Sequence, residues 1–309
     1  MSEPRVSVVI PAYRCAAIIG TAINSILAQT RVPDEIIVVD DGSPDDIAAA
    51  LAPFGGRVRL LRKSNGGASS ARNMGIDACS GNLVALLDSD DVWHPGKLAS
   101  QLAVFQKHPE VGLVASRYLI LSPDGSEEVY PGLRQAAWDT VLRPAGPAIF
   151  DTVVLIWTSS TIIRREVLGH HRFDEHLRIA EDRDMWVRLV SETPIYLQSE
   201  ITATLVEMKG SLSRSDVDLD CRSMLQMIRR YHHMLGTAGV RRWEAYVHRR
   251  WAAEYLGVGQ SRKAIGPALR RLRVQPLSPE GWWVLGKSMA LSVAPWLRAD
   301  MAGVEGATM

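Results

Sequence analysis

The sequence predicts an α/β protein, with a mostly parallel central sheet flanked by helices in residues 1–220 and an all-helical extension in residues 221–309. In the first hundred residues, short apolar runs rich in Val and Ile alternate with longer helical patterns, and this alternation is typical of a parallel sheet with crossover helices. After residue 220 the strand patterns stop and helices rich in Arg and Trp follow. Hydrophobic residues make up 47% of the chain and charged residues 22%, which is the composition of a folded protein.

The first element is a strand at residues 6–10, a β-branched run closed by Pro11. A helix should follow, because one face of the next segment carries Ile19, Ala22, Ile23, Ile26 and Leu27. Three further strands are predicted at residues 35–39, 57–61 and 83–87. Between the last two, the loop Ser64-Asn65-Gly66-Gly67 leads into a helix at residues 68–78.

The middle of the chain is less regular. Strands are predicted at residues 111–121, 157–163 and 201–206, with a turn at residues 122–125 that leads into another strand. A helix is predicted at residues 181–190, and its buried side should carry Met185, Trp186, Leu189 and Val190. No element is assigned to residues 130–155.

Charge is distributed unevenly along the chain. Residues 1–220 contain 21 Lys and Arg against 29 Asp and Glu, a net charge of −8, whereas residues 221–309 contain 14 against 5, a net charge of +9. Cys15, Cys79 and Cys221 lack metal-ligand spacing, so we expect neither a zinc site nor a disulfide framework. We expect a cytoplasmic protein, because the sequence shows neither a signal peptide pattern nor a bilayer-spanning run.

The apolar run at residues 83–87 ends in three carboxylates, Asp88, Asp90 and Asp91. Ligands of open α/β sheets gather at the carboxyl ends of such buried strands. Three acids in one place repel one another unless a divalent cation lies among them, and Mg²⁺ or Mn²⁺ held by one or two carboxylates commonly also holds a diphosphate. The alternative is an acidic turn that caps the next helix.

Two other segments could contact a nucleotide. Asp40 and Asp41 follow a predicted strand, and an ionised carboxylate there could accept a hydrogen bond from a base N–H or a ribose hydroxyl. Asn65-Gly66-Gly67 and Arg72 place small residues and a cation at a helix start, where an anion could dock. Each segment could equally be an ordinary turn, with Arg72 in solvent.

Glu181 and Asp182 open a predicted helix. Acids in a first turn are ordinary partners of the helix dipole, but a carboxylate there could also act as a general base on a hydroxyl nucleophile. The spacing does not decide which of the two acts.

Five segments in order resemble the pattern of glycosyltransferase family 2, whose members are inverting sugar transferases of the Rossmann-like GT-A fold. They are Val-Ser-Val-Val-Ile-Pro-Ala-Tyr (6–13), Ile-Val-Val-Asp-Asp-Gly-Ser (37–43), Asn-Gly-Gly-Ala-Ser-Ser-Ala-Arg-Asn (65–73), Leu-Asp-Ser-Asp-Asp (87–91) and Ala-Glu-Asp-Arg-Asp-Met-Trp (180–186). The resemblance covers residues 5–215 and implies a catalytic domain over residues 1–220, with nucleotide-sugar binding in residues 1–110 and the acceptor side in residues 111–220.

The resemblance also implies roles for single residues. Asp182 would be the catalytic base, and Asp90, in the D-x-D pattern, would ligate Mg²⁺ or Mn²⁺. Asp91, Glu181 and Lys209 are secondary candidates. The implied nucleotide-binding residues are Pro11, Tyr13, Asp40, Asp41, Arg72, Asp88 and Ser89.

The implied reaction is a single displacement. Asp182 would deprotonate an acceptor hydroxyl as its oxygen attacks the anomeric carbon of a nucleoside-diphosphate sugar, with UDP the favoured nucleotide, in bacterial polysaccharide or glycolipid synthesis at the cell envelope. The Gln-x-x-Arg-Trp motif and membrane helices of processive members are not found, so we expect transfer of one or a few sugars. Met208-Lys209-Gly210-Ser211-Leu212-Ser213 resembles the family's closing loop but lacks its Arg-x-His pattern.

Two alternatives to a glycosyltransferase remain. A sugar nucleotidyltransferase would also use acids at strand ends, but its Gly-rich N-terminal loop for triphosphate is not offered by residues 11–15. A non-catalytic scaffold of the same fold would bind nucleotide sugars without transferring them, although Asp90 and Asp182 are both present.

The basic extension at residues 221–309 carries Trp282, Trp283 and Trp296 and could contact anionic lipid at the cytoplasmic face of the inner membrane. It could equally be a helical cap on the acidic catalytic domain or a homodimer surface. Nucleic-acid binding is not expected, because no recognition module is found.

Overall fold

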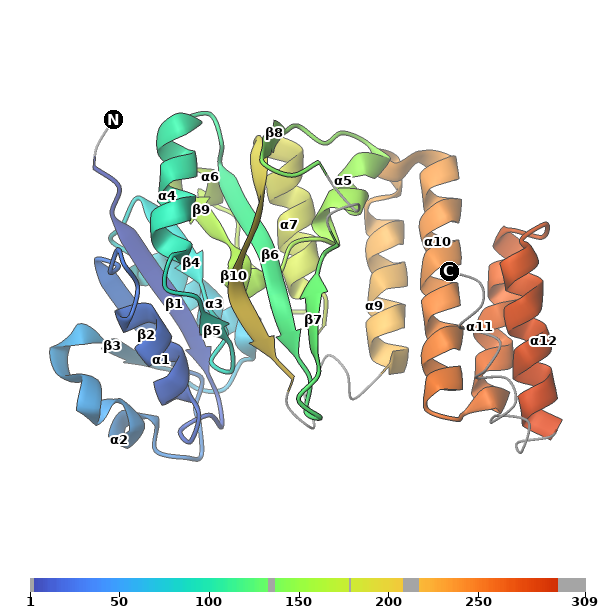
Figure 1. Cartoon of the computed structure of the whole chain (residues 1–309), viewed down its shortest axis with the longest axis horizontal. Coiled ribbons are helices and arrows are strands. Elements are labelled where there is room, and N and C mark those ends of the chain that lie inside the picture. The colour runs from blue at the N-terminus through green and yellow to red at the C-terminus, as the bar shows by residue number, and fades with distance from the viewer. Residues whose placement is uncertain (1–2, 133–136, 178, 208–216, 294–309) are drawn as a thin grey trace. The chain divides into compact units, whose positions relative to one another are not determined.

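The computed structural model describes residues 3–132, 137–177, 179–207 and 217–293, and the chain forms two compact units, residues 1–211 and 212–309 (Figure 1). The change in composition at residue 220 falls inside the first described helix of the second unit, α9 (Val217–Arg230). Asp218 and Asp220 lie in the first turn of α9. Because of these two acids, the basic composition begins after the boundary between the units at residues 211 and 212.

Within the described residues of the first unit, ten strands form one sheet in the order β3-β2-β1-β4-β9-β6-β10-β5, with β7 beside β6 and β8 beside β10. β3, β2, β1 and β4 are parallel neighbours, which confirms the parallel arrangement predicted for the first hundred residues. Their bounds are β1 (Val6–Ala12), β2 (Glu35–Asp40), β3 (Arg59–Arg62) and β4 (Leu83–Leu86).

The sheet is mixed beyond β4. β9 (Ile162–Arg164) is antiparallel to β4 and to β6 (Leu113–Leu121), whereas β10 (Ile195–Val206) is parallel to β6. The short strands β5 (Val92–Trp93), β7 (Glu127–Tyr130) and β8 (Thr140–Leu142) add antiparallel pairs. β10 begins well before residue 201, because a register shift after Gln198 interrupts the alternation of the strand.

The strand predicted at residues 157–163 is wrong for its first half. A 3₁₀ turn, η3 (Thr158–Ser160), precedes β9. Hydroxyl groups stabilise this turn: Ser160 Oγ donates to the carbonyl of Trp157 (2.8 Å) and Thr161 Oγ1 donates to the carbonyl of Thr158 (2.8 Å). Such hydrogen bonds from a side chain to the nearby backbone compete with the backbone pairing of a strand, and at this turn they replace it.

The helices of this unit bury the faces that the sequence predicts. Ile19, Ala22, Ile23 and Ile26 are buried in α1, and Met185, Trp186, Leu189 and Val190 are buried in α7. α3 packs so closely on the sheet that a Cβ atom at Gly75 would lie 2.3 Å from Val9 Cγ1. The bounds are α1 (Ile19–Leu27), α2 (Ile47–Leu51), η1 (Ala52–Arg57), α3 (Ala68–Ala78), α4 (Lys97–Lys107), α5 (Pro147–Val153), α6 (Arg165–Leu168) and α7 (Glu181–Glu192).

The described part of the second unit is helical. α9 packs on α10 (His232–Gly257), α10 on α11 (Ser261–Val274), and α11 on α12 (Pro279–Val293). The non-helical backbone of Gly236 breaks α10 near its start. Over the described residues of both units, no helix combines the length and the apolar character needed to cross a bilayer.

Candidate active site

Three parallel strands bring the predicted site residues to one end of the sheet. Ala12, the last residue of β1, pairs with Asp40, the last residue of β2, and β4 ends at Leu86, two residues before Asp88. Tyr13 follows β1 with 44% of its surface exposed, and the guanidinium of Arg14 lies 5.3 Å from its ring centroid. An exposed ring at this end of the sheet is suited to stack on a base.

Asp40 is fully buried and already bound by the protein. Its carboxylate accepts hydrogen bonds from the backbone N–H of Ser43 (2.8 Å) and from Arg62 Nε (2.7 Å). Burial alone would raise the pKa of Asp40, but these two donors outweigh it and lower the pKa. Asp40 is therefore an ionised acceptor, and a base N–H would compete for it with the exposed side chain of Arg62.

Asp41 holds the glycine-rich loop. Its carboxylate accepts hydrogen bonds from the backbone N–H groups of Gly66 (2.9 Å) and Gly67 (2.7 Å), and from Lys63 Nζ (2.9 Å). The N–H groups that we expected to receive an external anion therefore receive a carboxylate of the protein itself. With three donors and 2% exposure, Asp41 positions the start of α3 and offers little surface to a nucleotide.

Arg72 joins two parts of the site. On α3, it is buried and makes ion pairs with Asp88 (Nη2 to Oδ1, 2.6 Å) and Glu181 (Nη1 to Oε1, 2.9 Å). Burial opposes its charge, but the two carboxylates outweigh burial and raise the pKa of Arg72. Arg72 is thus not a solvated side chain; it ties the residue after β4 to the start of α7.

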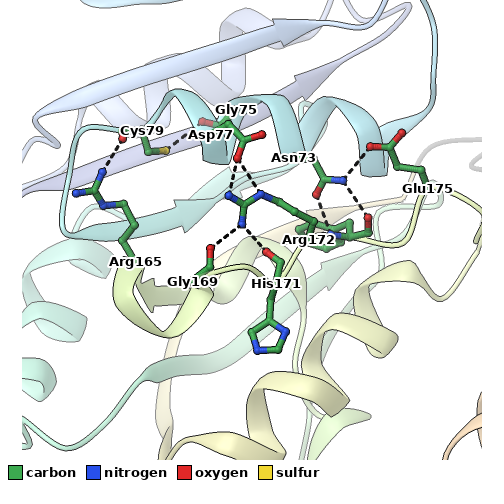
Figure 2. A network of polar contacts seen from close by, with 10 residues as sticks. Asn73, Gly75, Asp77, Cys79, Arg165, Gly169, His171, Arg172 and Glu175 are labelled. Atoms are coloured by element: carbon green, nitrogen blue, oxygen red, sulfur yellow. Dashed lines mark hydrogen bonds and ion pairs between the residues drawn. The ribbon is translucent and has the colours of Figure 1, made fainter.

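Asn73, the residue after Arg72, makes hydrogen bonds with the segment that precedes α7 (Figure 2). Asn73 Oδ1 accepts from the backbone N–H of Phe173 (2.8 Å), and Asn73 Nδ2 donates to the carbonyl of Phe173 (2.9 Å). The ring of Phe173 lies 5.3 Å from the guanidinium carbon of Arg72 and meets Trp186 of α7 edge-on. Asn73 therefore fixes the backbone of Phe173, whose ring lies against the guanidinium of Arg72.

The carboxylates of the acidic loop, residues 88–91, lie in different surroundings. Asp91 is 2% exposed and points inward, where Trp157 Nε1 (3.0 Å), the hydroxyl of Ser159 and the backbone N–H of Val206 (3.3 Å) donate to it. Burial and the charges of Asp88 and Asp90 raise the pKa of Asp91. Asp91 is therefore built into the fold, which makes it a poor candidate for a cation ligand.

Asp90 is the carboxylate of this loop that suits a cation. No other described residue donates a hydrogen bond to its side chain, and burial, with the charge of Asp88 second, raises its pKa to about 6. A divalent cation would remove this penalty. The described residues contain no group of three or more His, Cys, Asp or Glu that could hold a metal, so water and phosphate oxygens would complete the shell, as is usual for Mg²⁺.

The start of α7 presents the two candidate bases. Ala180, in the left-handed conformation (φ 67°), precedes Glu181 and Asp182. Glu181 pairs with Arg72, yet burial and the neighbouring charge of Asp182 raise its pKa. Asp182 is half-buried and accepts a hydrogen bond from the backbone N–H of Arg183 (2.7 Å). Of the two candidate bases, Glu181 is therefore engaged by Arg72 and Asp182 is not.

A match to a protein-family model shows the family of this chain. The model of glycosyl transferase family 2 matches residues 7–171, more than half of the chain. The chain belongs to glycosyl transferase family 2. The matched residues include β1 to β4 and the acidic loop, whereas α7 lies beyond them.

Several proteins described as glycosyltransferases are similar to this chain. An uncharacterized glycosyltransferase of Rickettsia prowazekii is 32% identical over 204 residues, which are 64% of this chain and 63% of the relative. The glycosyltransferase GlyG of Streptococcus pneumoniae is 28% identical over 229 residues, 71% of this chain and 76% of GlyG. The chain thus spans less than two thirds of the length of the Rickettsia relative.

Solved structures confirm the predicted fold. Residues 1–349 of S. aureus TarS, in complex with UDP-GlcNAc, match with a TM-score of 0.63 over 87% of this chain and 81% of that chain, at 19% identity. The complex with UDP matches with a TM-score of 0.62 over 92% and 88%, also at 19% identity. At this identity the likeness shows the GT-A fold alone.

Sequence reasoning missed some residues of this candidate site. Trp157, Ser159 and Phe173 contact Asp91, Asp88 or Arg72 although they lie far from them in the chain. Short-range patterns carry no signal for such contacts. Of the other predicted site residues, Pro11 and Ser89 are half-buried. Lys209 lies outside the described residues.

Proposed function

We propose that this protein is a metal-dependent, inverting glycosyltransferase that moves a sugar from a nucleoside-diphosphate sugar to an acceptor hydroxyl. The observation that carries the proposal is the double ion pair of Arg72, which joins Asp88 of the acidic loop to Glu181, the neighbour of Asp182. A donor diphosphate held at the acidic loop and an acceptor hydroxyl at Asp182 would then share one site, as a single displacement requires.

Each carboxylate has a separate task in this proposal. Asp90, whose side chain receives no hydrogen bond from the other described residues, would hold Mg²⁺ or Mn²⁺ together with the donor diphosphate. The bound cation supplies charge stabilisation to the departing nucleoside diphosphate. Asp182 accepts the proton of the acceptor hydroxyl, and Glu181, held by Arg72, keeps the first turn of α7 in place.

UDP is the nucleotide that we favour. Two similar structures of TarS contain UDP-GlcNAc and UDP, and Tyr13 and Asp40 offer a ring and a carboxylate at the end of the sheet where a uracil would lie. We propose a saccharide or lipid-linked acceptor in bacterial polysaccharide or glycolipid synthesis, with transfer of one or a few sugars.

Release of the nucleoside diphosphate tests the function. The purified protein is mixed with UDP-, dTDP- or GDP-sugars, an acceptor extract and either Mn²⁺ or EDTA, and the released nucleoside diphosphate is measured. We expect Mn²⁺-dependent release from one class of donor. Binding of a nucleotide sugar without release, with every acceptor tried, would favour the scaffold alternative, and nucleoside triphosphate consumption would favour a nucleotidyltransferase.

We further propose that the helical unit contacts anionic lipid, through the outer face of α12, defined here as Trp282, Trp283, Met289 and Val293. These side chains are 58%, 47%, 53% and 80% exposed, whereas the opposite side of α12 packs on α11. Residues 217–293 carry 13 Lys and Arg against 5 Asp and Glu, and Lys287 Nζ lies 4.8 Å from the ring centroid of Trp283. Exposed Trp beside cations suits an anionic bilayer surface at the cytoplasmic face of the membrane.

The double substitution Trp282→Ala, Trp283→Ala should weaken binding to vesicles that contain anionic lipid by about tenfold or more, because two large apolar side chains no longer enter the interface. Co-sedimentation with anionic and with neutral vesicles measures the effect. Tyr246→Ala, at an exposed aromatic residue of α10, is the matched control and should bind as the unaltered protein does. Equal binding by all three proteins would remove the membrane proposal.

A further inference from the structure

The buried turn at residues 158–161 contacts the acidic loop through one hydroxyl group. Ser159 is fully buried, and its Oγ accepts a hydrogen bond from the backbone N–H of Asp88 (3.0 Å) and donates one to the carboxylate of Asp91. A serine hydroxyl has a single proton, so donation to Asp91 leaves its lone pairs for Asp88. One side chain therefore holds both ends of the acidic loop.

The turn is itself held firmly on the side away from the loop. The carbonyl of Ser159 accepts from Trp93 Nε1 (2.7 Å), and the carbonyl of Ser160 accepts from Gln101 Nε2 (2.9 Å). Lys97, fully buried, donates to Gln101 Oε1 (2.6 Å), and its Nζ lies 4.6 Å from the ring centroid of Trp93. Because these groups leave the turn little freedom, the position of Ser159 Oγ is fixed by the core of the unit.

The two contacts of Ser159 explain why the carboxylates of Asp90 and Asp91 differ in their hydrogen bonding. Asp91 is drawn inward by Ser159 and Trp157, and the backbone of Asp88 is held at the start of the loop. Asp90 lies between these two fixed points, and no other described residue donates to its side chain. Without the hydroxyl of Ser159, the loop would lose one contact at each end. Arg72 would still pair with Asp88 and Trp157 would still donate to Asp91, so Asp90 would be held less firmly but the loop would stay attached.

We propose that Ser159 is a positioning residue that presents Asp90 to the cation and diphosphate of the donor. The inference rests on the proposed function, because it assigns Ser159 a role in the same site. Ser159 would touch neither the nucleotide nor the reacting atoms, and it acts through the backbone of Asp88 and the carboxylate of Asp91. Its contribution should therefore appear in the metal-dependent part of nucleotide binding.

The test compares Ser159→Ala with Ser160→Ala, in which an equally buried hydroxyl that bonds to the carbonyl of Trp157 is removed. UDP affinity is measured by calorimetry with Mn²⁺ and with EDTA, and thermal melting reports stability. In Ser159→Ala, we expect the gain in affinity that Mn²⁺ provides to fall by about tenfold, with UDP affinity in EDTA unchanged. Ser160→Ala should lower the melting temperature to a similar extent and keep the full gain from Mn²⁺.

A full Mn²⁺-dependent gain in Ser159→Ala, or an equal loss in both variants, would overturn the inference. If Ser159→Ala does not fold, Ser159→Cys replaces it, because a thiol is a weaker donor and acceptor of nearly the same shape and should give a partial loss. An unaltered protein that binds UDP, dTDP and GDP no better with Mn²⁺ than with EDTA would instead overturn the proposed function, and this inference with it.

Discussion

Asp182→Asn is expected to abolish sugar transfer while leaving the affinity for the donor nucleotide within a few-fold of its original value. Asn has nearly the shape of Asp, so the first turn of α7 and its contact with Arg183 should persist, but an amide does not accept the proton of the acceptor hydroxyl. Loss of a general base typically lowers the rate by about 10²- to 10⁴-fold. Nucleoside diphosphate release measures the rate, and calorimetry measures the nucleotide affinity.

The Glu181→Gln variant distinguishes the roles of the two acids at the start of α7. The amide oxygen of the substituted side chain would still accept a hydrogen bond from Arg72, but the charge of the 2.9 Å ion pair would be lost, so we expect transfer to be reduced and not abolished. Near-normal turnover in Asp182→Asn, with loss of turnover in Glu181→Gln, would reverse the assignment of the base.

Arg72→Met is expected to cause the largest loss of stability among single changes at the site. Methionine can fill the space of the arginine stem, but Asp88 and Glu181 would lose their shared cation in a largely buried place. Removing one partner of a buried ion pair typically costs about 3–5 kcal/mol. The free energy of unfolding in urea measures this loss, and bound UDP should not restore it fully.

Arg172→Met is the matched control for Arg72→Met. Arg172 pairs with Asp77 near Asn73 and also donates to the carbonyls of Gly169 and His171 (Figure 2). The side chains of Arg172 and Asp77 are both accessible to solvent, so water can replace these contacts. Such pairs contribute about 0–1 kcal/mol. Equal and small losses in the two variants would contradict the view that Arg72 holds the acidic loop and α7 together.

The sequence predicted the parts of the fold that depend on local patterns. The helix at residues 68–78 has the predicted bounds because a glycine-rich loop precedes it and its apolar positions recur with a helical period. β10 and η3 differ from expectation because polar residues 198–200 interrupt one strand, while hydroxyl groups replace the pairing of another. Mixed pairing beyond β4 was also not evident, since antiparallel order there depends on contacts across the sheet.

The candidate site was predicted as a set of residues but not as a set of contacts. Parallel strands end at the same edge of a sheet, and this predicted that Asp40, Asp88 and Asp90 lie near one another, whereas Asp182 was assigned by the family resemblance. The family resemblance ranked Asp90 above Asp91 as a cation ligand, but it gave no physical reason. The reason is that no other described residue donates to the side chain of Asp90, whereas three groups donate to Asp91. That difference arises from Trp157, Ser159 and Val206, whose positions depend on the tertiary fold.

Calorimetric titration of the unaltered protein and of Asp90→Ala with UDP, in Mn²⁺ and in EDTA, tests the central claim most directly. The claim is that the acidic loop binds a nucleoside diphosphate through a divalent cation at Asp90. We expect UDP to bind the unaltered protein more tightly with Mn²⁺ by about tenfold or more, and the gain to disappear in Asp90→Ala because the cation loses its carboxylate ligand. Tight binding in EDTA, or an undiminished gain from Mn²⁺ in Asp90→Ala, would contradict the claim.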